Sequence, residues 1–133
     1  GSWKCETTMP AGAMGPGSPE MKNKTSIKIK KTLDGFAYEG EYNSKKTKEM
    51  PAMTGRFVMA WDTARKQIVS VLVDTMGGIS QTSGAISGDV ATLTGSGSMM
   101  GQSMKVREVI TTKPGGKELG HTFEADMGNG FQM

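Results

Sequence analysis

The sequence predicts an all-β protein, an antiparallel up-and-down barrel of about nine to ten strands whose last strand is truncated. Segments rich in β-branched and aromatic residues alternate with turn residues along most of the 133-residue chain. The 19 glycines are spread between these segments and do not form one tract, which is typical of turns and bulges. Successive hairpins without long crossovers favour an up-and-down barrel.

Length and composition indicate a single domain over residues 1–133, large enough to bury a core without disulfide or metal cross-links. The net charge is +3, and lysines are concentrated between Lys22 and Lys48. Few arginines and no interleaved aromatic residues accompany them, so we favour a solvated sheet face over a nucleic-acid surface. The chain has no apolar run long enough for a transmembrane helix.

The cysteine content and the first residues bear on the compartment. Cys5 is the only cysteine, so no internal disulfide is predicted; either it is a small buried residue or its partner lies outside this chain. The chain begins with Gly1-Ser2, so we expect that any leader has been removed.

The first strand is predicted from Ser2 to Thr8, with Trp3, Cys5 and Thr7 on one face. A long Pro/Gly-rich loop over residues 9–21 follows it. A basic loop over residues 44–53 separates the second hairpin from the central one, and its proline blocks ladder pairing.

Asp34-Gly35 is the strongest turn signal, a two-residue type I′ turn that pairs Leu33 with Phe36. In this register apolar residues meet on one face and opposite charges meet on the other. The predicted pairs are Lys31–Tyr38, Ile29–Gly40 and Ile27–Tyr42, and on the other face Lys30–Glu39 and Lys28–Glu41.

The stretch 54–78 holds the longest apolar run and predicts a central hairpin, divided by the polar residues 62–66. One face of its strands is expected to carry Phe57, Met59 and Trp61 with Val69, Val71 and Val73, and the opposite face Val58, Ala60, Ile68 and Leu72. Because both faces are apolar, we expect other structure or a partner to cover the outer face.

Two further hairpins are predicted at Gly88-Asp89 and at Pro114-Gly115. The first pairs Ile86 with Ala91 and Gly84 with Leu93; the second pairs Ile110 with Leu119, Val106 with Phe123 and Lys105 with Glu124. After a turn at 128–130, residues 131–133 are expected to begin a tenth strand that stops. This predicts an open edge, through which a homodimer can form.

Several motifs carry a family resemblance. Gly1-Ser2-Trp3 resembles the Gly-x-Trp signature of lipocalin-like barrels, which implies that Trp3 plugs one barrel end and that Arg107 packs over it. The longer pattern consists of Gly55, Trp61-Asp62, Asp74, Met76-Gly77, residues 84–89, 104–107 and 123–127. It resembles the uncharacterised bacterial domain-of-unknown-function family 1579. This resemblance implies a lipocalin-like, calycin-type β-barrel, usually exported to the periplasm or secreted, with no established activity and one further strand.

The residues do not predict an enzyme. No Gly-x-Ser-x-Gly elbow precedes a helix, and Asp74 and Glu108 would meet only by accident of folding. His121 is the only histidine; a late-strand histidine binds haem iron in some related barrels, but a packed or surface role is favoured here. No cofactor is therefore predicted.

The favoured function is non-enzymatic binding of a small apolar ligand inside the barrel. The predicted lining residues are Tyr38, Tyr42, Phe57, Met59, Trp61, Val71 and Phe123, with Arg107 and His121 as polar anchors. Against this, a small barrel filled by its own side chains would bind nothing.

Two alternatives stay open. One is a structural or protein-interaction module of the bacterial envelope. The other is copper binding by some of the 12 methionines, among which Met99, Met100 and Met104 cluster. Thioethers select Cu(I), although methionines more often fill irregular cores.

Overall fold

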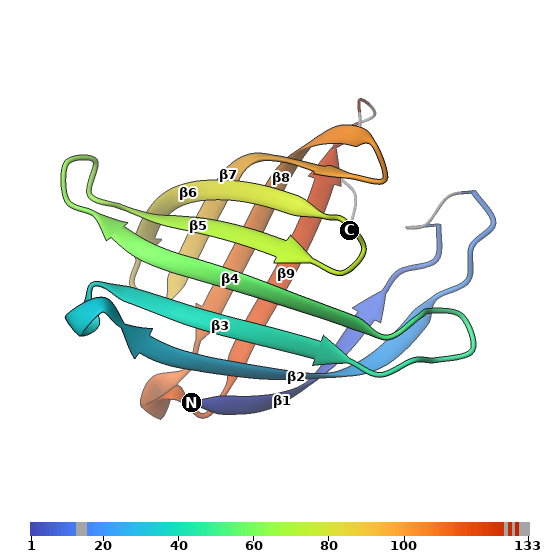
Figure 1. Cartoon of the computed structure of the whole chain (residues 1–133), viewed down its shortest axis with the longest axis horizontal. Helices are drawn as coiled ribbons and strands as arrows, with labels where there is room; N and C mark the ends of the chain where they lie inside the picture. Colours follow the sequence, from blue (N-terminus) through green and yellow to red (C-terminus); the bar gives the residue numbers. More distant parts are fainter. Residues whose placement is uncertain (13–15, 127, 129, 131–133) are drawn as a thin grey trace.

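The structure is a computed structural model that describes residues 1–12, 16–126, 128 and 130. Over these residues it contains nine antiparallel strands and two 3-10 turns, at Leu33–Gly35 and Pro114–Gly116 (Figure 1). The strands are β1 (Ser2–Met9), β2 (Met21–Thr32), β3 (Ala37–Ser44), β4 (Met53–Asp62), β5 (Gln67–Asp74), β6 (Ile79–Ser87), β7 (Val90–Met99), β8 (Gln102–Thr112) and β9 (Leu119–Asp126). The all-β prediction is confirmed.

The strands form one sheet in which each strand pairs with the next, from β1 to β9. The sheet curls into a nearly closed barrel, so that β8 and β9 lie behind β3–β5 in Figure 1. No ladder joins β1 to β9 among the described residues. At one end β1 contacts the β8–β9 connection, because the indole N–H of Trp3 donates to the Gly116 carbonyl at 3.1 Å. Residues 131–133, the predicted tenth strand, lie outside the described residues.

The β2–β3 hairpin has the predicted register. Lys31 pairs with Tyr38 and Lys30 with Glu39, and the pairs Ile29–Gly40, Ile27–Tyr42 and Lys28–Glu41 are present as well. The predicted pair Leu33–Phe36 is not part of the ladder, because the ladder ends at Thr32 and Ala37 and both Leu33 and Phe36 belong to the connection. Asp34 and Gly35 have φ values of 55° and 88°, the positive φ that a type I′ turn requires. The Phe36 N–H closes the turn on the Leu33 carbonyl at 3.0 Å.

The central hairpin, β4–β5, is apolar on both faces as predicted, but the predicted combination of faces is wrong. Trp61 pairs with Ile68 and Ala60 pairs with Val69, because residues 63–66 form the loop. The inner face therefore joins Phe57, Met59 and Trp61 to Ile68 and Leu72, and the outer face joins Val58 and Ala60 to Val69, Val71 and Val73.

The β6–β7 hairpin has the predicted register, with Ile86 opposite Ala91. The β8–β9 register differs from the prediction by two residues: Ile110 pairs with His121, and Val106 pairs with Ala125. The connection extends over residues 113–118 instead of closing at a two-residue Pro-Gly loop. A shift of two residues preserves which side chains face inward.

The best-packed part of the barrel lies along β6, β7 and β8. Leu93 and Val106 are fully buried there. Gly84 and Gly95 allow the close approach of these strands, since a Cβ atom at either would lie under 2 Å from a backbone oxygen of the neighbouring strand. Such inward glycines let a sheet bend sharply. None of the described helices has the length and apolarity to cross a membrane.

The first prediction concerns this bend. A Cβ at Gly95 would lie 1.9 Å from the Gln81 carbonyl oxygen, so we expect Gly95→Ala to lower the free energy of unfolding by roughly 3 kcal/mol, as overpacking does. The matched control is Gly120→Ala in β9, where the nearest atom would lie 3.7 Å away; it should change stability by less than about 1 kcal/mol. Urea denaturation measures both, and equal losses would contradict the assignment.

Candidate functional site

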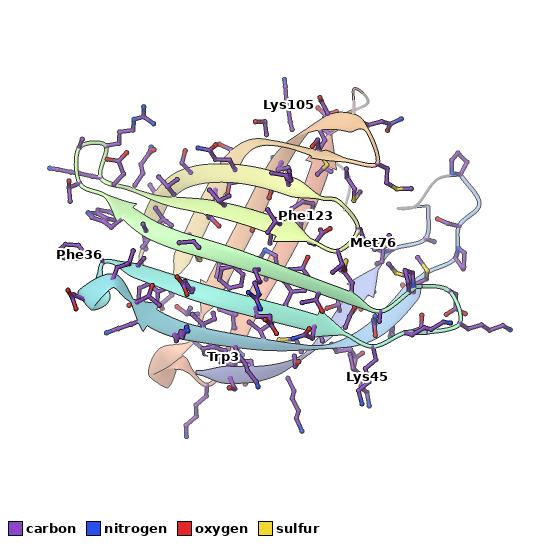
Figure 2. All side chains as sticks on the ribbon, in the orientation of Figure 1. Trp3, Phe36, Lys45, Met76, Lys105 and Phe123 are labelled. Carbon is purple, nitrogen blue, oxygen red and sulfur yellow. The ribbon has the colours of Figure 1, made fainter. Side chains whose placement is uncertain are left out.

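The candidate site is the inner face of the barrel. One row of cross-strand partners runs through Met59, Ser70, Thr82, Gly95 and Val106. Ser70, Thr82 and Val106 are among the most buried residues, so this row identifies the face that points inward. By the same register, most of the predicted lining residues share that face: Tyr38, Tyr42, Phe57, Met59, Trp61, His121 and Phe123. Figure 2 shows Phe123 within the outline of the barrel, while Lys45 and Lys105 extend from its outside.

Two of the predicted lining residues lie on the outer face. Val71 pairs with Val58 on that face and is 43 % exposed. Arg107 pairs with Thr94, and its guanidinium forms an ion pair with Glu124 of β9. The expected contact of Arg107 with Trp3 is also wrong, since Trp3 is on the inner face beside Ile27. Because side chains alternate between the two faces along β8, Arg107 and Trp3 lie on opposite faces of the sheet.

Glu108 occupies the inward position next to Arg107, and its side chain joins three strands. It is 6 % exposed. The Thr82 hydroxyl of β6 donates to one carboxylate oxygen at 3.2 Å, and His121 Nε2 of β9 lies 3.0 Å from the other. The sequence contained a signal for this position, because Met104, Val106 and Ile110 are apolar at the same alternate positions of β8. Glu108 therefore belongs to the apolar face.

A second polar contact joins Tyr42 of β3 to Asp74 of β5 across Gly55. The ring of Tyr42 covers this glycine, where a Cβ would lie 2.1 Å from its Cε1 atom. The phenol oxygen reaches to 3.5 Å from Asp74 Oδ2. Asp74 is held in place because its Oδ1 accepts the N–H groups of Met76 and Gly78, both at 2.9 Å.

The electrostatics of Tyr42 link the two polar contacts. Burial raises the pKa of the Tyr42 phenol well above its ordinary value, and the negative charges of Asp74 and Glu108 raise it further. A phenolate is disfavoured both by desolvation and by nearby carboxylates. The two acidic groups therefore act on one region of the interior.

The inner and outer faces differ in the sign of their charge. On the described strands Lys31 is the one lysine or arginine with an inward position, and it lies next to the β2–β3 turn. The other strand lysines of β2 point outward, where Lys28 and Lys30 face Glu41 and Glu39. The inner wall thus carries the carboxylates Asp74 and Glu108, beside the imidazole of His121.

A depression of about 200 Å³ lies at the ends of β4 and β5. Its walls are Thr54, Arg56, Val73, Asp74 and Thr75. Because Arg56 and Val73 are outward residues, we regard it as the rim of the barrel.

The methionines weighed for copper binding differ in their exposure. Met104 is buried, whereas Met100 is 74 % exposed in the β7–β8 turn. Methionine-based copper binding stays a prediction. Cys5 is a half-buried free thiol on β1. Among the described residues no group of three His, Cys, Asp or Glu side chains could hold a metal ion.

Comparison with known proteins supplies the family. A family model described as "Protein of unknown function (DUF1579)" matches residues 1–129, which confirms the expected resemblance. No curated protein matches the chain.

The second prediction uses the raised pKa of Tyr42. In the unfolded chain a tyrosine ionises near its ordinary pKa of 10.0, while folded Tyr42 stays protonated above that pH. The unfolded state is then favoured as the pH rises past 10. The wild type should therefore lose stability between pH 9 and pH 11. Above pH 10 the free energy of unfolding should fall by roughly 1.4 kcal/mol per pH unit at most, and by less because the group is only half-buried.

Tyr42→Phe removes this ionisation, so its stability should fall less over the same interval. Tyr38→Phe is the matched control and should retain the loss, because Tyr42 is unchanged. Urea denaturation at the two pH values measures the difference, and identical pH dependence in Tyr42→Phe and the wild type would contradict the burial of this phenol.

Proposed function

The chain belongs to the DUF1579 family, and we propose that it binds a small, largely apolar ligand inside its barrel without catalysing a reaction. The observation that carries the proposal is the accessibility of the inner face. The inward rings of Tyr38, Trp61 and Phe123 are 43 %, 49 % and 37 % exposed. In a barrel filled by its own side chains, such rings would be buried.

The total surface area supports the same proposal. The chain exposes 9056 Å², about a third more than the roughly 6,700 Å² expected of a folded monomer of 14.1 kDa. Among the described residues the buried apolar core consists of Ala37, Ala91, Leu93, Met104 and Val106. The core is therefore small, and described inward rings such as those of Tyr38, Trp61 and Phe123 keep exposed surface.

The chemistry of the lining fits a binding site. Ligand pockets are mostly apolar, with a few polar groups that orient the ligand. Here aromatic residues of β3, β4 and β9 supply the apolar surface, and methionines such as Met59 adapt to irregular shapes. Glu108 and His121 supply the polar groups.

The arrangement of these polar groups supports a role in binding over catalysis. In a nucleophilic triad the imidazole lies between the hydroxyl and the carboxylate, so that it can take the hydroxyl proton. Here the carboxylate of Glu108 lies between the Thr82 hydroxyl and the His121 imidazole. In this order the Thr82 hydroxyl is hydrogen-bonded to the Glu108 carboxylate, and the His121 imidazole lies on the other side of that carboxylate.

A second candidate function, an interaction module of the bacterial envelope, is favoured by the outer face of β4–β6. Val58, Val71, Val73 and Ile79 are 43–54 % exposed there. They are neighbours, since Val58 pairs with Val71 and Val73 pairs with Ile79. Exposed apolar patches of this kind mark contact surfaces. Sedimentation over a range of concentrations tests this candidate, and a strict monomer would count against self-association.

The third prediction tests ligand binding with neighbouring residues on opposite faces. N-phenylnaphthylamine should bind the protein with a rise in probe fluorescence. Met59→Glu places an unpaired carboxylate on the inner wall and should weaken binding by about tenfold or more. Val58→Glu, one residue away on the outer face, should leave the affinity unchanged.

Equal effects of the two substitutions would contradict an internal site, and absence of probe binding would contradict the proposed function. Native mass spectrometry of the protein purified from its own organism gives a second readout. A co-purifying small molecule that is lost in Met59→Glu and retained in Val58→Glu would support the same site.

A further inference from the structure

We propose that the ligand inside the barrel carries a cationic amine, which pairs with the Glu108 carboxylate. This inference rests on the proposed function, because it names the chemical class of the ligand that the same inner face binds. It is carried by the sign of the charge inside the barrel, by the partners of Glu108 and by the aromatic surface beside it.

The sign of the charge inside the barrel follows from side-chain alternation in β8. An anchor at Arg107 would suit an anionic ligand such as a fatty acid. The register instead turns Arg107 outward to Glu124 and turns Glu108 inward. Asp74 adds a second inward carboxylate, and the inward lysine, Lys31, lies at the end of β2. An anionic headgroup beside Asp74 and Glu108 would meet like charges.

The partners of Glu108 that the structure describes include no lysine or arginine to compensate its charge. Its contacts among the described residues are the Thr82 hydroxyl and the His121 imidazole, and the latter is charged only when protonated. A carboxylate at 6 % exposure is costly without an opposite charge. A carboxylate also has about four acceptor positions, so an ammonium group can bind while both existing contacts persist.

Aromatic surface lies directly beside this carboxylate. Phe123 is the cross-strand partner of Glu108, and its side chain faces inward with 37 % of its surface exposed. The row of inward partners that contains Glu108 continues through Leu93, Gly84 and Ile68 to Trp61. Ring faces attract organic cations, and the apolar members of the row suit a hydrocarbon tail.

A bare metal ion fits this wall less well than an amine. A divalent cation takes several oxygen or nitrogen ligands at once, and no group of three such side chains is found among the described residues. An organic amine needs one carboxylate and apolar surface, which the inner wall provides.

The experiment compares three probes with the same tail: octylamine, octanol and octanoate. Each competes with N-phenylnaphthylamine for the 133-residue protein at neutral pH and fixed ionic strength. We expect octylamine to bind about tenfold more tightly than octanol, and octanoate more weakly than octanol. In Glu108→Gln, octylamine should lose its roughly tenfold advantage over octanol, because the amide carries no charge to pair with the ammonium group.

The matched control is Glu124→Gln, which removes a carboxylate from the outer face of β9 and should leave the probe ranking as in the wild type. Octanoate binding as tightly as octylamine, or an equal loss for octylamine and octanol in Glu108→Gln, would overturn the inference while the proposed binding function stands. Failure of every probe to bind would overturn both. If Glu108→Gln does not fold, the ranking of the three probes on the wild type decides.

Discussion

The two-residue period of a β-strand, carried through eight consecutive ladders, is the constraint on which the rest of the structure depends. Once each hairpin connection sets its register, every side chain is assigned to the interior or to the outside. In β8 this assignment places Glu108 inside and Arg107 outside. The change of one position reverses the charge that faces the interior, so the chemistry of the inner face follows from the register more than from the residue types present.

Glycines then divide the barrel into two unlike walls. Gly84 and Gly95 let β6 and β7 approach closely, and the buried residues gather on that side. On the opposite side Gly40 and Gly55 lie under the rings of Phe57 and Tyr42, so aromatic rings cover the sheet and part of that surface stays accessible. The packed wall supplies stability, and the aromatic wall is the surface that we propose for a ligand.

The buried carboxylate of Glu108 contributes to stability and is also the group that we propose for ligand recognition. Glu108 links β6, β8 and β9 through Thr82 and His121, so it holds strands that are distant in sequence. A buried network of this kind stabilises a structure only while its members are satisfied. The proposed ligand, by adding a donor to Glu108, would therefore stabilise the strands that this carboxylate links.

The sequence by itself determined the all-β class, the strands, the family and the register of the β2–β3 and β6–β7 hairpins. These depend on local turn chemistry, such as the Asp34-Gly35 turn, and on alternation within a strand. Only the tertiary structure decided the β8–β9 register, the outward positions of Val71 and Arg107 and the meeting of Glu108 with His121. Alternation shows which residues share a face of one strand, but which face points inward depends on pairing between strands. That pairing is set by connection lengths, such as residues 113–118, and by the curvature of the whole sheet.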